Sequence, residues 1–172
     1  ILEGSLQLID FQIVDNTHLQ QTSTADHIGS GVLIGHFCRI SWESHKADPS
    51  RTPMFRDVVG QSADCQHKPY EFDLMEAWEA AQEYDEDEAD ENERVLELGG
   101  FVFHESRCGS TLVANMLQAL NPEQHRVYSE SPPPVAALKV CGEDYQNCSI
   151  EVAASVLKAV IYLMSRSGSG DG

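Results

Sequence analysis

The chain is poor in positive charge. Its 172 residues include 11 Lys and Arg against 28 Asp and Glu, which gives a formal net charge of −17. Proteins that bind the phosphate backbone of nucleic acids need a basic surface, so this balance excludes a general nucleic-acid binder. Residues 95–172 contain five Lys and Arg and eight Asp and Glu, a net −3, so residues 1–94 carry −14. Any anion site must act through local geometry, because the overall field repels anions.

The sequence also lacks a membrane-spanning run and a metal-ligand motif. No stretch approaches the ~20 consecutive apolar residues that cross a bilayer, and no signal-peptide pattern is present. None of the five cysteines belongs to a Cys-x-x-Cys pair, so we expect neither a zinc site nor another metal. Cys141 and Cys148 are close enough in sequence to close a small loop in an oxidising compartment. An odd number of cysteines leaves one free under any pairing.

The most informative stretch is Gly100–Leu120, GFVFHESRCGSTLVANMLQAL. Its apolar start, Phe101–Phe103, predicts a short buried strand. After a polar turn, apolar residues recur at i, i+3, i+4 and i+7 and predict one face of a helix: Val113, Met116, Leu117 and Leu120. Such a turn directs unpaired N–H groups and the positive end of the helix dipole towards an anion. Arg107 adds a positive charge, so the stretch predicts an anion cradle for a nucleotide.

The turn differs from the loop of ordinary NTPases. That motif, G-x-x-x-x-G-K-[ST], uses its Lys to bind the terminal phosphates. Here Gly109 is followed directly by Ser110 and Thr111, with no Lys between them. This difference argues against magnesium-dependent ATP hydrolysis. A cysteine phosphatase is not supported either, because no Arg stands six residues after Cys108, and we expect Cys108 to pack within the loop.

The segment SRCGSTL resembles the 5′-phosphosulfate loop of sulfotransferases, which bind the sulfate donor PAPS on a P-loop-like α/β fold. Cytosolic members carry Lys where Arg107 stands, and Golgi-type members often carry R-S-G-S-[ST]. The resemblance covers residues 51–166 and includes the pattern VYSESPP at 127–133. It implies that seven residues hold PAPS without a metal: Ser106, Arg107, Cys108, Gly109, Ser110, Thr111 and Leu112.

The resemblance also implies a catalytic base. Golgi-type sulfotransferases place a carboxylate at the tip of the strand beside the phosphate loop, and Glu130 follows Arg126–Ser129, a predicted second strand. An acceptor hydroxyl loses its proton as it attacks sulfur, and a partly desolvated Glu can take that proton. Arg107 would act with Glu130 by holding the transferred group. In the alternative interpretation Glu130 only caps the chain or pairs with an Arg, and Glu105 is the weaker candidate for the base.

We therefore expect an α/β, three-layer P-loop-like fold with a mainly parallel sheet and an N-terminal β-containing extension. Four segments are predicted: the extension at 1–50, a helical segment with an acidic loop at 51–94, the PAPS-binding core at 95–166 and a flexible tail at 167–172. Within them, Ile1–Val14 and Gly31–Trp42 predict strands, and Ser149–Arg166 predicts a helix. The acidic run Glu83–Glu93 predicts a solvated loop.

The predicted function is transfer of a sulfuryl group from PAPS to a hydroxyl or amine acceptor. The part of the family that grips the 3′-phosphate of PAPS has no counterpart here, so we expect a truncated core. Two alternatives remain, a degenerate, non-catalytic nucleotide-binding module and a small-molecule kinase or NTPase. The sequence leaves the acceptor and the oligomeric state open, and the resemblance leaves the Golgi lumen and the cytoplasm as alternative locations.

Overall fold

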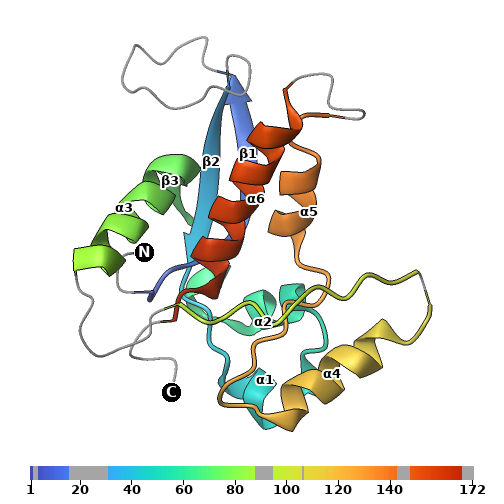
Figure 1. The fold of residues 1–172 in the computed structure, drawn as a ribbon. Coiled ribbons are helices and arrows are strands. Elements are labelled where there is room, and N and C mark those ends of the chain that lie inside the picture. Colours follow the sequence, from blue (N-terminus) through green and yellow to red (C-terminus); the bar gives the residue numbers. More distant parts are fainter. Residues whose placement is uncertain (2–3, 16–30, 88–94, 106, 143–147, 168–172) are drawn as a thin grey trace.

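The computed structural model describes residues 1, 4–15, 31–87, 95–105, 107–142 and 148–167 (Figure 1). Its elements, in chain order, are β1 (Gln7–Asp15), β2 (Gly31–Cys38), α1 (Glu43–Ala47), η1 (Pro49–Arg51), α2 (Phe55–Gln61), η2 (Asp64–Gln66), β3 (Tyr70–Asp73), α3 (Leu74–Asp87), α4 (Ser110–Leu120), α5 (Pro132–Leu138) and α6 (Ile150–Ser165).

The sheet has three strands in the order β1-β2-β3, and both pairs are antiparallel. In β2, buried and partly buried residues alternate, as in a strand that turns one face to the core. Gly35 lies where core side chains approach the strand closely. A Cβ atom there would lie 2.7 Å from Cε2 of Phe37 and 3.2 Å from Cδ1 of Leu74, so a side chain cannot be accommodated without a shift.

Helices α3, α5 and α6 pack with the strands to form the main core, and α6 lies in front of β1 and β2 in Figure 1. The helix α6 agrees with the predicted Ser149–Arg166 because its apolar side chains recur at helical spacing and meet the sheet. The core combines residues that are distant in sequence: Leu8, Phe11, Leu33, Phe37, Leu74, Ala77, Ala81, Ala137, Val140, Cys141, Ala153, Val156, Val160, Leu163 and Met164.

A second, smaller core lies beneath the end of β2. It contains Cys38, Ile40, Trp42, Phe55 and Val58, with Tyr128 packed against it. The ring of Tyr128 lies 5.2 Å from the rings of both Trp42 and Phe55. A disulfide, Cys38–Cys65, joins β2 to η2 beside this core. The packing of Tyr128 therefore connects the segment between α4 and α5 to the α1–α2 region.

The expected three-layer fold with a mainly parallel sheet is wrong. In the described part of the chain the only sheet is the small antiparallel one, and its strands come from residues 7–73. The two strands predicted after residue 95 do not form. Phe101–Phe103 is an exposed extended segment. Arg126–Ser129 is irregular because its contacts are with α2 and the end of α6 rather than with a neighbouring strand. The sheet thus lies far from the predicted anion loop in sequence.

Candidate functional site

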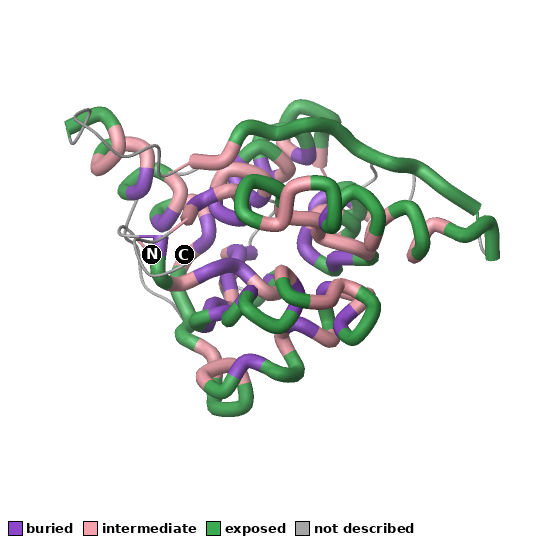
Figure 2. Tube along the Cα trace, turned by 90° about the horizontal axis from the view of Figure 1, so that it is seen from below, coloured by how far each residue is buried: buried purple, intermediate pink, exposed green. Residues whose placement is uncertain are grey.

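The turn predicted to hold an anion lies between an extended segment and α4. The chain reaches it through residues 97–105, which are exposed throughout, and Figure 2 shows a long exposed run of this kind along one edge of the molecule. Ser106 lies outside the described residues. The helix that follows is confirmed as predicted, and it begins directly after Gly109. The local order of extended segment, turn and helix is therefore retained without the sheet.

Gly109 caps α4 with its backbone rather than with a side chain. Its φ of 90° lies in the left-handed region, which suits Gly because a Cβ atom would be strained there. Its carbonyl oxygen accepts hydrogen bonds from the N–H groups of Leu112, at 3.0 Å, and Val113, at 3.3 Å. The N–H groups of Ser110 and Thr111 make no hydrogen bond to another described residue, so they remain available to an anion at the helix N-terminus.

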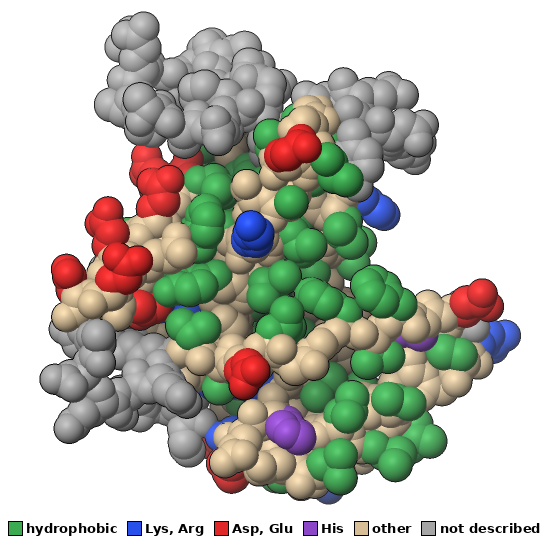
Figure 3. Space-filling model, viewed as in Figure 1, with side chains coloured by type: hydrophobic (Ala, Val, Ile, Leu, Met, Phe, Trp, Pro, Cys, Tyr) green, Lys and Arg blue, Asp and Glu red, His purple; other side chains and the backbone are tan. Residues whose placement is uncertain are grey.

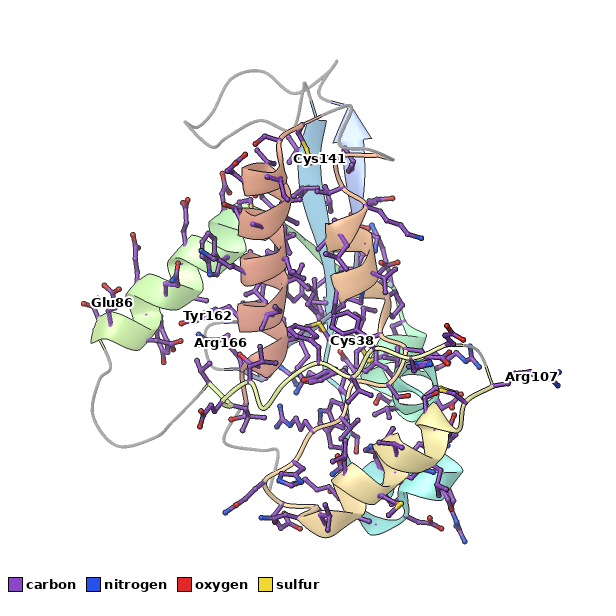
Figure 4. The ribbon with its side chains drawn as sticks, turned by 45° about the vertical axis from the view of Figure 1, so that its right-hand side comes forward. Cys38, Glu86, Arg107, Cys141, Tyr162 and Arg166 are labelled. Carbon is purple, nitrogen blue, oxygen red and sulfur yellow. A yellow bond between two sulfur atoms is a disulfide. The ribbon has the colours of Figure 1, made fainter. Side chains whose placement is uncertain are left out.

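Arg107 is exposed and points away from the body of the molecule (Figure 4). It makes no ion pair with any residue of the described ranges. Its φ of 64° is also left-handed, which is uncommon for a residue with a side chain. The side chain is therefore free to rotate towards an anion at the start of α4 without breaking an ion pair.

Cys108 is exposed, and among the described cysteines it is the free one. The prediction that it packs within the loop is therefore wrong. The reason is that no helix or strand of the described residues covers Cys108. Its neighbours Ser110 and Thr111 are half-buried, whereas Leu112 is exposed.

Glu130 lies between two anchored residues. The carbonyl of Ser129 accepts a 2.9 Å hydrogen bond from the N–H of Phe55, and Ser131 is buried at the start of α5. Glu130 itself is exposed, and its φ of 51° is left-handed. The backbone is therefore held on both sides of Glu130, and the residue lies at the surface.

No ion pair joins Glu130 to the loop in the described part of the chain. No ion pair joins it to Arg107 or Arg126 within the part of the chain that the structure describes, so the pairing alternative finds no support. Arg126 instead lies 5.5 Å from the ring centroid of Trp42 and donates a 3.1 Å hydrogen bond to the carbonyl of Arg166. Glu105 is exposed beside the loop. Glu130 and Arg107 are, however, the two non-glycine residues with positive φ in the described chain.

No family model matches the chain. Neither a curated protein nor a solved structure matches it significantly.

Sequence reasoning missed a buried polar cluster between α3 and α6. Arg166 is 1% exposed and donates hydrogen bonds to Asp85 and, at 3.1 Å, to the carbonyl of Ala81. Tyr162 also donates to Asp85, and Figure 4 shows its side chain near Arg166. Burial, followed by the contact with Asp85, raises the pKa of Tyr162 to about 12. This cluster lies on the opposite side of the view from Arg107, and one of its buried atoms, Oδ1 of Asp85, has no hydrogen-bond partner among the described residues.

The cluster changes the interpretation of the acidic run. Residues Glu83–Asp87 belong to α3, so that part of the predicted loop is helical, and residues 88–94 lie outside the described residues. The sequence signal that was missed is the single Arg directly after the apolar helix. If this Arg is buried, its charge requires a buried acidic partner. No group of three or more His, Cys, Asp or Glu side chains suited to a metal occurs within the described ranges. Nor does any described helix have the length and apolar character to cross a bilayer.

Proposed function

We propose that the turn from Arg107 to Thr111 binds the 5′-phosphosulfate of PAPS, and that the chain is a sulfotransferase-like protein. One observation carries the proposal: α4 begins with the N–H groups of Ser110 and Thr111 unbonded to described residues, beside an Arg that no described carboxylate pairs with. Helix N-termini bind phosphate and sulfate through such groups and through the helix dipole.

Each residue of the turn contributes a different kind of contact. Gly109 allows the turn to end in a left-handed conformation, and the N–H groups that follow it donate to the anion. The hydroxyls of Ser110 and Thr111 add two further donors. Arg107 supplies charge-assisted hydrogen bonds from a planar group that matches two oxygens of a phosphate or sulfate. Leu112 is part of the resembling motif and forms the first apolar position of the helix.

The proposed reaction is transfer of the sulfuryl group from PAPS to a hydroxyl or amine. Arg107 and the N–H groups of the turn would stabilise the charge on the transferred group, and Glu130 would remove the proton of the acceptor. The left-handed backbone at Arg107 and Glu130 supports this pair, because strained conformations of non-glycine residues concentrate at functional sites.

A second candidate is a non-catalytic nucleotide-binding module. It is favoured by the exposure of the turn and by the absence of an ion pair between Glu130 and the described residues of the loop. A kinase or NTPase is favoured by no observation of the described residues. The disulfides Cys38–Cys65 and Cys141–Cys148 support an oxidising compartment for any of these functions.

Calorimetric titration tests the proposal. We expect PAP, the desulfated product of PAPS, to bind more tightly than ATP with magnesium, and Arg107→Ala to weaken PAP binding by about 10–100-fold, the worth of a hydrogen bond to a charged group. Arg56→Ala is the matched control, because Arg56 is also exposed and makes only a 3.9 Å contact with Asp57. Equal effects of the two variants, or no binding of PAP, would overturn the proposal.

A further inference from the structure

The segment before the turn and the helix after it expose an unusual amount of apolar surface. We call this surface the strand–helix face. It consists of Phe101, Phe103, Leu112, Val113, Met116, Leu117 and Leu120. These side chains are between 37% and 86% exposed, with Phe103 the most exposed. Figure 3 shows hydrophobic side chains gathered over the region in which Figure 1 places α4. The apolar spacing of Val113, Met116, Leu117 and Leu120 predicted one face of a helix, and the described chain does not cover that face.

The size of the face is that of a protein interface. Given their exposed fractions, the seven side chains offer on the order of 700–800 Å² of apolar surface, since a fully exposed aromatic side chain presents about 150–250 Å² and an aliphatic one somewhat less. The largest apolar patch on an ordinary monomer is about 300–600 Å². A stable interface buries about 800 Å² on each partner. The strand–helix face therefore has the area that a stable dimer needs.

The extended half of the face has no backbone partner among the described residues. Leu98–Phe103 makes no backbone hydrogen bond to another described residue, whereas Leu96, just before it, donates to the carbonyl of Ser165 at 2.8 Å. The rings of Phe101 and Phe103 lie 6.1 Å apart, on one side of the extended segment, as expected for residues i and i+2 of a strand. An exposed, extended apolar segment is a template for pairing with another strand.

Charge favours a second copy of this chain as the occupant. Neither Leu98–Phe103 nor α4 contains Asp, Glu, Lys or Arg, while the whole chain carries −17. Two copies that meet through this face therefore keep their carboxylates apart, whereas contact through acidic surfaces is repulsive. A twofold axis through the extended segment would pair it antiparallel with itself and complete the hydrogen bonds of both copies in a closed interface.

We propose that the strand–helix face is the interface of a homodimer, in which Phe101–Phe103 pairs with its own copy and the two α4 helices pack beside it. The proposal rests on exposure, backbone pairing and charge, and it does not depend on the binding of a nucleotide.

Sedimentation velocity of the whole chain over the micromolar range tests the proposal. We expect a monomer–dimer equilibrium, and Phe103→Asp is expected to raise the dissociation constant by at least about tenfold, as for a central apolar contact. Met116→Glu, on the helix half of the face, is expected to act in the same direction. Ile150→Asp is the matched control, because Ile150 is equally apolar and 59% exposed but lies at the start of α6. Circular dichroism should show that all three variants keep the fold.

Two further measurements, the salt dependence of association and a spin label on Cys108, test the dimer independently. Raising the salt concentration screens the repulsion between acidic chains, so we expect tighter association. A spin label on Cys108, the free thiol beside the face, should report two interacting labels per particle in a closed dimer. A chain that stays monomeric, association that Ile150→Asp weakens as much as Phe103→Asp, or association that salt abolishes would overturn the proposal. Particles with more than two labels would also overturn it, since they indicate open-ended contact.

Discussion

The ion pair between Arg166 and Asp85 gives the sharpest prediction about stability. Arg166→Met keeps much of the volume and the apolar stem of Arg166 but removes its charge. Asp85 then retains the hydrogen bond from Tyr162 and loses its cation. Removing one member of a buried pair costs about 3–5 kcal/mol, because the remaining charge stays partly desolvated. The side chain of Asp85 is 19% exposed, so we expect the lower end, about 3 kcal/mol.

Urea unfolding followed by circular dichroism, with the disulfides intact, measures this loss. For a chain of this length, 3 kcal/mol corresponds to a fall in melting temperature of about 6–12 °C. The matched control is Arg56→Met, which breaks the exposed 3.9 Å contact with Asp57 and should change stability by less than about 1 kcal/mol.

A double-mutant cycle isolates the pair from other effects of the substitution. Asp85→Asn combined with Arg166→Met removes both charges, so it should cost clearly less than the sum of the two single variants. The reasoning would be refuted if Arg166→Met proved as mild as Arg56→Met, or if the two substitutions were additive.

Three further predictions concern single titrating or catalytic groups. Folding raises the pKa of Tyr162 from 10.0 to about 12. The contribution of Tyr162 to stability is therefore complete below pH 10 and is lost as the pH rises towards 12. Alkaline unfolding curves of Tyr162→Phe should lack this loss. Burial lowers the pKa of His45 below its ordinary 6.5, so stability is complete above pH 6.5 and falls as the pH drops below it; His45→Gln should flatten this acid limb in melts recorded across pH. Glu130→Gln should bind PAP normally while PAPS-dependent transfer falls by about 10²–10⁴-fold, and equal transfer by this variant and the wild type would remove Glu130 as the base.

The elements predicted well from the sequence are those with long, regular apolar patterns. The helix α6 spans Ile150–Ser165 within the predicted range, and β1 and β2 lie within or next to the predicted strands. The helix α4 was also predicted, because its apolar spacing and the preceding Gly determine it locally. The Cys141–Cys148 disulfide was among the pairings considered, since its two residues are neighbours in sequence.

What the sequence did not reveal depends on contacts between distant residues. Phe101–Phe103 has the composition of a buried strand, but a run of three apolar residues carries no information about a partner, and the described chain provides none. Asp85, within the helical stretch Glu83–Asp87, pairs with Arg166, which lies 81 residues later in the chain. The Cys38–Cys65 disulfide likewise joins residues 27 positions apart.

The site was predicted only in part, for the same reason. The turn and its helix N-terminus follow from local sequence, so the free N–H groups after Gly109 were predictable. The position of Glu130 depends on the packing of Tyr128 against Trp42 and Phe55, which no local pattern indicates.

The central claim is that the N-terminus of α4 binds the phosphosulfate of PAPS. Its most direct test is the change in the backbone amide resonances of a ¹⁵N-labelled chain as PAP is added. We predict that the largest shifts are those of Gly109, Ser110 and Thr111, and that Arg107→Ala suppresses them while Arg56→Ala does not. Saturating PAP that leaves these three amides unchanged, or that shifts another region instead, would contradict the claim.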